Sequence, residues 1–66
     1  MNIDCTKLDL ALARAGLDIN ELCTKSGIPI ITFSQVRRGI RKPHPKTVGR
    51  IAAALGVDPA ELIETE

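Results

Sequence analysis

Apolar residues recur along this chain at intervals of three and four positions, which places them on one side of an α-helix. One such stripe consists of Leu8, Ala11, Leu12 and Ala15. A second stripe consists of Val48, Ile51, Ala52 and Leu55. No segment shows the alternation of apolar and polar residues that is typical of a half-buried strand. The pattern therefore predicts an all-α protein.

Several of the predicted helices begin at residues that can cap them. Asp4, Asp18 and Asp58 each provide a carboxylate that can accept hydrogen bonds from the first free N–H groups of a helix. Glu21 and Glu61 follow two of these caps at the spacing of a capping box. Apolar pairs flank the caps and can pack across them: Ile3 with Leu8, Leu17 with Leu22, and Val57 with Leu62.

Prolines and glycines set the remaining boundaries. Pro29 and Pro45 suit the first turn of a helix, because the missing N–H has no partner there and φ is already helical. The glycines expected to end helices are Gly16, Gly27, Gly39 and Gly56. The predicted helices cover about 5–15, 19–26, 30–38, 45–55 and 59–64.

Residues 27–29 separate the second and third predicted helices by a tight turn, as in helix-turn-helix units. Helices this short cannot lie side by side in an up-and-down bundle, so we expect them to cross at steep angles. A chain of 66 residues supports one core. We therefore expect residues 1–66 to form a single helix-turn-helix domain.

The charges are unevenly distributed, although the net charge is only +1. Residues 37–50 contain six basic residues and no acidic one, whereas residues 51–66 contain four acids and no base. Such a cationic block is typical of a surface that meets a polyanion, and a solvated loop is the alternative if the block is considered alone. Because Phe33 is the only aromatic residue, the stacking platforms of RNA and single-strand binders are missing, which leaves duplex DNA.

The third predicted helix has two different sides. If Phe33 and Val36 point into the core, the outward side is shared by Ile30, Ile31, Ser34, Gln35 and Arg38. A helix fits the major groove, where each base pair shows its own pattern of hydrogen-bonding groups. The amide of Gln35 can pair with adenine, and Thr32 or Ser34 can bond a base or a phosphate.

Taken together, these residues resemble the lambda repressor-like family, also called Cro/C1-type or Xre helix-turn-helix domains. The resemblance covers about residues 8–62. It is carried by Gly16 with Leu17, Glu21-Leu22-Cys23, Gly27-Ile28, Phe33, Val36, Arg38-Gly39 with Pro43, Ile51-Ala52 and Leu55-Gly56-Val57. The resemblance implies a compact five-helix fold whose third helix reads the major groove. In the family, the positions that face the groove are those of Ile30, Ile31, Thr32 and Gln35.

The resemblance also implies where phosphates are held. In the family, these contacts come from the start of the second helix, the end of the third helix and the following loop. The corresponding residues here are Asn20, Arg38, Arg41, Lys42 and Lys46. Backbone amides at a helix N-terminus also suit an anion. These groups are expected to set affinity and salt dependence rather than base choice.

Two features depart from the family. Members often pair an Arg of the first helix with a Glu near the end of the third, at positions occupied here by Leu12 and Arg37. Because both partners are replaced, no buried charge is left alone. Arg37 is then free either to approach DNA or to remain a solvated side chain. A Gln that often opens the second helix is Ile19 here, so the resemblance does not carry its phosphate contact.

The isoleucines support a second hypothesis, in which the domain binds a protein and not DNA. Ile30, Ile31 and Ile40 can form an exposed apolar patch, and such patches often mark protein interfaces. The domain would then be a protein–protein interaction module. The cationic block favours DNA, because an apolar protein interface does not need six basic residues without an acidic one.

An enzyme, a cofactor and a small-molecule ligand are not expected, because no phosphate-binding loop or paired-carboxylate site is visible. Cys5, Cys23 and His44 do not have the spacing of a metal site, and both cysteines are expected to be reduced. No segment approaches the roughly 20 apolar residues of a membrane span, and no signal sequence is visible, so we expect a cytoplasmic protein.

The family resemblance implies a small transcriptional regulator, of which a repressor that occupies its operator is the simplest form. It also implies a homodimer on DNA, with two half-sites about one helical turn apart. Ile63 and the last helix are the candidate dimer contact, with packing against the core of the same chain as the alternative.

Overall fold

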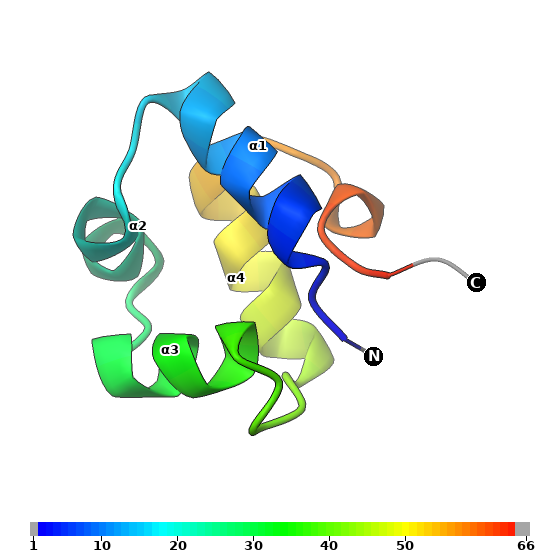
Figure 1. The fold of residues 1–66 in the computed structure, drawn as a ribbon. Coiled ribbons are helices and arrows are strands. Elements are labelled where there is room, and N and C mark those ends of the chain that lie inside the picture. Colours follow the sequence, from blue (N-terminus) through cyan, green and yellow to red (C-terminus); the bar gives the residue numbers. More distant parts are fainter. Residues whose placement is uncertain (1, 65–66) are drawn as a thin grey trace.

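The computed structural model describes residues 2–64, which form four α-helices and one short 3-10 helix (Figure 1). The elements are α1 (Cys5–Ala15), α2 (Ile19–Ser26), α3 (Ile30–Arg37), α4 (Pro45–Leu55) and η1 (Pro59–Glu61). No strand is formed within the described residues, so the predicted all-α class is confirmed. Within the same residues, no helix has the length and apolar character to cross a bilayer.

The aspartate caps form as expected. The carboxylate of Asp4 accepts a hydrogen bond from the amide of Lys7 at 3.1 Å. Asp18 and Glu21 form a complete capping box, with N–O distances of 2.7 and 3.1 Å. A second box begins η1 (Pro59–Glu61). By contrast, α3 and α4 begin at Pro29 and His44, whose side chains make no capping bond.

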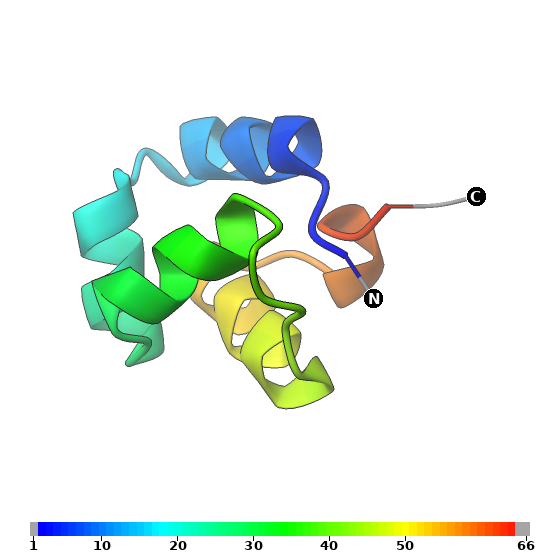
Figure 2. The same cartoon turned by 60° about the horizontal axis from the view of Figure 1, so that its bottom comes forward.

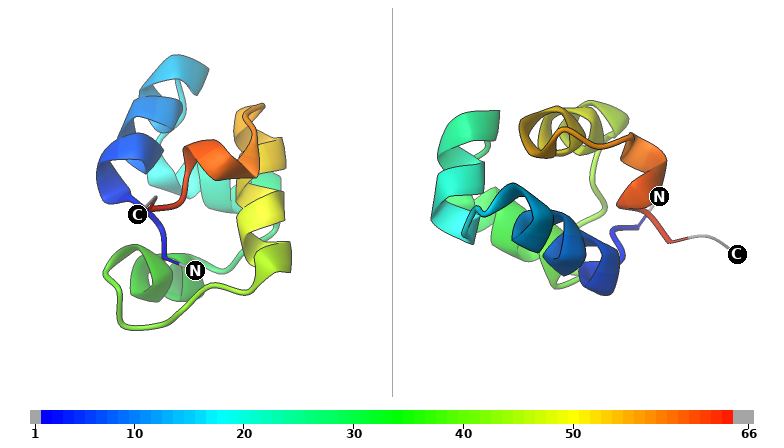
Figure 3. Two further views of the ribbon diagram at one scale, coloured as in Figure 1. Left: turned by 90° about the vertical axis from the view of Figure 1, so that its right-hand side faces the viewer. Right: turned by 90° about the horizontal axis from the view of Figure 1, so that it is seen from above.

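The prediction of five α-helices is wrong at the C-terminal end of the fold. A helix was expected over residues 59–64, but only residues 59–61 form a single 3-10 turn. The following residues pair with the N-terminal segment instead: Ile63 forms an antiparallel bridge with Ile3, and the amide of Asp4 donates to the Leu62 carbonyl at 2.8 Å. The extended backbone that this pairing requires stops the helix. The two segments lie side by side in Figure 3.

The third helix ends one residue before the predicted position, at Arg37. Gly39 follows with φ +77°, a left-handed conformation that residues with a Cβ rarely adopt. The amides of Gly39 and Ile40 donate to the carbonyls of Val36 and Gln35, at 3.2 and 3.0 Å. This is the hydrogen-bond pattern of a Schellman cap, and it turns the chain sharply away from the axis of α3.

The core lies between α4 and the elements that surround it. Contacts join α4 to α1, α2 and η1, and α3 packs on α2. The most completely buried large side chains are Phe33, Leu8, Leu22, Ile51, Leu62 and Val48. No buried residue of the core is polar or charged within residues 2–64. One side of α3 is left uncovered by this arrangement, at the front of Figure 2.

Candidate nucleic-acid interface

The two sides of α3 differ sharply in exposure. Phe33 and Val36 are 2% and 5% exposed, and both belong to the core. Ile30, Ile31 and Ser34 are exposed on the other side. α3 runs along one edge of the molecule, preceded by the tight turn from α2 (Figures 1 and 2). This uncovered helix is the element that can approach a flat or grooved partner.

A shallow groove crosses the outer side of α3. Its lining residues are Ile30, Ile31, Ser34, Gln35, Arg38 and Ile40. The groove thus brings together all the predicted base-reading residues except Thr32, which is half-buried and outside this lining. Gln35 is also half-buried, so its amide has less freedom than that of a solvated side chain. Ile40, which precedes the cationic part of the loop, completes the groove from outside the helix.

The loop after α3 is held against the helix by its backbone. The amides of Ile40 and Arg41 both donate to the carbonyl of Gln35, at 3.0 and 3.2 Å. Pro43 is buried and anchors the loop before α4 begins. The predicted phosphate-binding side chains Arg38, Arg41, Lys42 and Lys46 are all exposed. Neither of the two ion pairs found within residues 2–64 involves any of the four.

The charges of α3, the loop and α4 themselves are of one sign, although Asp9 of α1 pairs with Arg37, and Glu64 lines a pocket with Arg38 and Arg41. Residues 22–57, which include α3, the loop and α4, contain no aspartate or glutamate. The capping aspartates lie at the starts of α1, α2 and η1, whereas α3 and α4 begin without a carboxylate. The positive end of each helix dipole at these two starts is therefore not neutralised by a cap. The arrangement suits a polyanion.

Asn20 occupies a different setting from the loop cations. Its side chain is exposed and borders the notch between α2 and the start of α3, together with Ile30. The amides at the start of α2 are partly taken up, because Asp18 accepts from the Glu21 amide and Glu21 accepts from the Asp18 amide. Two carboxylates at this helix start weaken its attraction for a phosphate. The Asn20 side chain remains available as a neutral donor.

The expectation that Arg37 is released needs correction. Nη2 of Arg37 donates to both carboxylate oxygens of Asp9 on α1, at 3.0 and 3.2 Å. This hydrogen bond, together with the charge of the carboxylate, raises the pKa of the Arg37 guanidinium. An ion pair between the first and third helices is therefore present, with the basic residue on α3 and the acidic residue on α1. Comparison with the family position Leu12 missed it, because Asp9 lies three residues earlier on α1.

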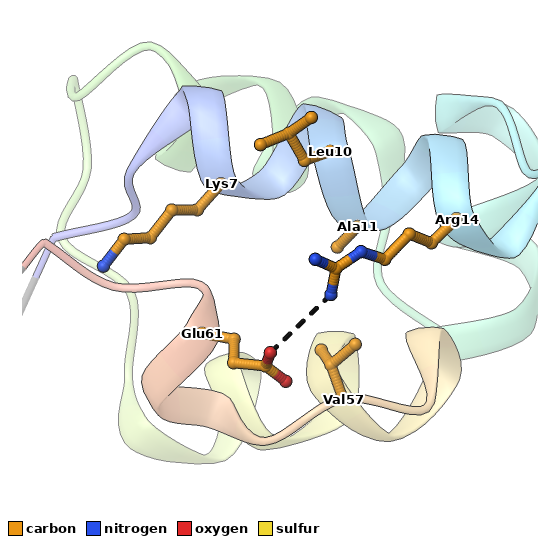
Figure 4. Close-up of a pocket in the computed structure, with 6 residues that line it drawn as sticks. All are labelled: Lys7, Leu10, Ala11, Arg14, Val57 and Glu61. Carbon is orange, nitrogen blue, oxygen red and sulfur yellow. Dashed lines mark ion pairs between the residues drawn. The ribbon is translucent and has the colours of Figure 1, made fainter.

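A second groove lies between α1 and η1, away from α3 (Figure 4). It is lined by Lys7, Leu10, Ala11, Arg14, Val57 and Glu61. Arg14 and Glu61 face each other across it, with 3.7 Å between guanidinium and carboxylate. The charges of this groove are thus partly matched within the chain, whereas Arg38, Arg41 and Lys42 form no ion pair within residues 2–64.

Two short helices joined by a tight turn, the second of them exposed on its outer side, form a helix-turn-helix unit. The helix-turn-helix family model matches residues 9–62 of the chain. The chain therefore belongs to this family, in its Cro/C1-type, Xre-like form, which is a DNA-binding family and not an enzyme family. Neither the curated proteins nor the solved structures contained a significant match.

Proposed function

We propose that this domain binds duplex DNA in a sequence-specific manner as part of a small transcriptional regulator. α3 enters the major groove with its outer side, and the loop that follows contacts the adjacent phosphates. The observation that carries the proposal is an uncovered α3 beside the exposed side chains of Arg38, Arg41 and Lys42, which form no ion pair within residues 2–64. In addition, no acid occurs between residues 22 and 57. Family membership supports the same function.

Base choice and affinity are assigned to different residues. Gln35, Ser34 and the isoleucines of α3 line the groove that would meet base edges. Thr32 remains a candidate for a base or phosphate contact at the flank of the helix. Arg38, Arg41, Lys42 and Lys46, with Asn20 as a neutral donor, supply the phosphate contacts, which position the helix and carry no sequence information by themselves.

Repression by occupancy of an operator is the simplest mode of action for such a domain, because binding alone blocks access to the DNA. Two copies on half-sites one turn apart would fit an operator with two-fold symmetry. Ile63 is half-buried against the core and bridged to Ile3. A dimer contact is therefore better sought on a surface whose side chains remain exposed.

Selection of bound duplexes from a random pool tests the proposal. We expect enrichment of a defined sequence, and a palindromic winner would support the dimer. The winning duplex is then titrated with protein at several salt concentrations. With four cations on phosphates in each copy, the logarithm of the binding constant should fall with the logarithm of salt with a slope of about −4 per bound copy. A pool that stays random, or affinity independent of salt, would refute DNA binding.

A protein-interaction role is the second candidate, and a specific observation favours it. Ile30, Ile31 and Ile40 are 48%, 70% and 66% exposed on one surface. Should selection yield no duplex, replacement of Ile31 by Ala combined with a measurement of self-association by sedimentation would test this role directly. Loss of an existing oligomer in that variant would assign the patch to protein contact.

A further inference from the structure

Ile40 differs in its exposure from the other apolar residues that directly follow a helix-ending glycine. Four such residues donate their amide to the carbonyl five positions earlier: Leu17, Ile28, Ile40 and Val57. Ile28 is buried, and Leu17 and Val57 are half-buried against the core. Ile40 alone of these four is left in solvent, at 66% exposed. Leu17 and Val57 also share the second bond of the cap, from the glycine amide to the carbonyl three positions earlier, so the helix cap does not require the exposure of Ile40.

The exposed side chain of Ile40 joins two others. Ile30 and Ile31 line the same groove on α3, and all three lie beside the polar groups of Ser34 and Gln35. Exposing three isoleucines on one surface forgoes the stabilisation that burial of such side chains gives. Exposed apolar patches of this kind mark binding sites for a partner.

The charges around the three isoleucines indicate which kind of partner fits this surface. Arg38 lines the same groove, and Arg41 and Lys42 follow Ile40 directly along the loop, all without an ion pair within residues 2–64. A polyanion fits this setting better than a protein surface does. The apolar group that duplex DNA displays in its major groove is the C5-methyl group of thymine, and this group has no hydrogen-bonding capacity for a polar side chain to use.

We propose that Ile30, Ile31 and Ile40 form a methyl-reading surface that recognises C5-methylated pyrimidines, with thymine as the ordinary ligand, in the major groove. The proposal rests on the DNA-binding function proposed above and specifies what α3 reads. Gln35, at the edge of the same groove, can pair with adenine through its amide. Both contacts together specify an A·T-rich half-site.

Removing single methyl groups from the DNA tests the proposal. Each thymine of the selected duplex is replaced by uracil, which differs only in the missing C5-methyl group. We expect one to three positions at which uracil weakens binding about fourfold, the effect of one buried methyl-sized group. At the same positions, 5-methylcytosine should bind about fourfold more tightly than cytosine, since that comparison restores the methyl group alone.

Variants of the protein connect these positions to the isoleucines. Ile31→Ala should bind the thymine duplex more weakly and lose its discrimination against uracil at one position. Leu10→Ala removes another exposed apolar side chain, from α1, and should discriminate as the parent protein does. Both positions are exposed, so neither variant is expected to unfold. Circular dichroism checks this.

The outcomes separate the two proposals. Specific, salt-dependent binding that tolerates uracil everywhere would overturn methyl reading and leave the DNA-binding function standing. Discrimination against uracil that survives in Ile31→Ala, Ile30→Ala and Ile40→Ala would also overturn it. Absence of any specific duplex binding would overturn both, and loss of an oligomer in Ile31→Ala would then assign the isoleucines to protein contact.

Discussion

Arg37 shows how a single residue changes its role through its neighbour. By sequence it belongs to the cationic block, but in the structure its guanidinium is held by Asp9. The two side chains remain 33% and 55% exposed, so solvent screens their attraction. Arg37 therefore links α1 to α3 and contributes less to the cationic surface than Arg38 does.

Replacing Asp9 by Asn should weaken this link. Because the pair is solvent-screened, we expect a loss of less than about 1 kcal/mol in the free energy of unfolding. The loss should shrink further at high salt, where the parent pair is also screened. Urea denaturation at low and high salt measures both effects. A loss that is large and independent of salt would show that Asp9 acts through packing and not through its charge.

Gln35 is the predicted hydrogen-bonding reader of α3. Gln35→Ala should relax base choice at one position of the selected duplex by about 1–3 kcal/mol, since a bidentate contact to adenine is lost. Competition binding with single-base variants of that duplex measures the change. Unchanged preference at every position would remove Gln35 from the set of reading residues.

Arg41 is predicted to contact phosphate only. Arg41→Ala should weaken binding to all duplexes alike and reduce the salt slope by about one. Arg14→Ala provides a matched control, because it removes the same charge from the groove between α1 and η1. The control should leave the slope unchanged. Equal effects of the two variants would indicate a response to net charge and not to a local contact.

Helix α3 has two functions: its inner side packs in the core, and its outer side is exposed to a partner. Phe33→Ala should cost about 3–5 kcal/mol, because the ring is almost fully buried and its removal leaves a cavity. The neighbouring Ser34→Ala lies on the exposed side and should change stability by no more than about 0.5 kcal/mol. Thermal melting of the two variants compares the sides of the helix. Similar melting temperatures would mean that α3 is not anchored through Phe33.

The ends of α3 distinguish it from its neighbours. It begins at Pro29 without a side-chain cap, and its final turn leads through Gly39 into a loop bonded to Gln35. Both features could be predicted from the prolines and glycines, although the helix was expected to reach residue 38. Gly39 takes the left-handed conformation as expected, and Arg38 is the C-cap between it and the last helical residue, Arg37.

At the scale of the whole molecule, folding protects one of two thiols. Cys23 is buried, and this burial raises the pKa of its thiol. Cys5 is exposed. In the native protein at neutral pH, a thiol reagent should therefore label Cys5 quickly and Cys23 only after unfolding. Mass spectrometry of the labelled chain, with and without urea, measures this. Rapid labelling of both thiols in the native state would contradict the packing of α2 described here.

The raised pKa of Cys23 also sets a direction for stability with pH. The thiol of Cys23 ionises at lower pH in the unfolded chain than in the native protein. At pH values below the ordinary thiol pKa it is protonated in both states, and the buried thiol then stabilises the native state fully. Stability should then fall as the pH rises through the native pKa. Cys23→Ala should remove this alkaline decline, which urea denaturation over a series of pH values can follow.

The four α-helices and their order could be predicted from local sequence, because caps, glycines and apolar spacing act within a few residues of one another. The sequence by itself also determined the acid-free stretch that makes one side cationic. Only the tertiary structure decided how distant residues meet. The pairing of Ile3 with Ile63 shortened the last helix, and the packing of α1 near the end of α3 gave Arg37 a partner. The exposure of Ile40 also depends on tertiary structure. The same helix cap precedes Leu17 and Val57, which pack against the core, so the cap alone does not decide whether the side chain is buried.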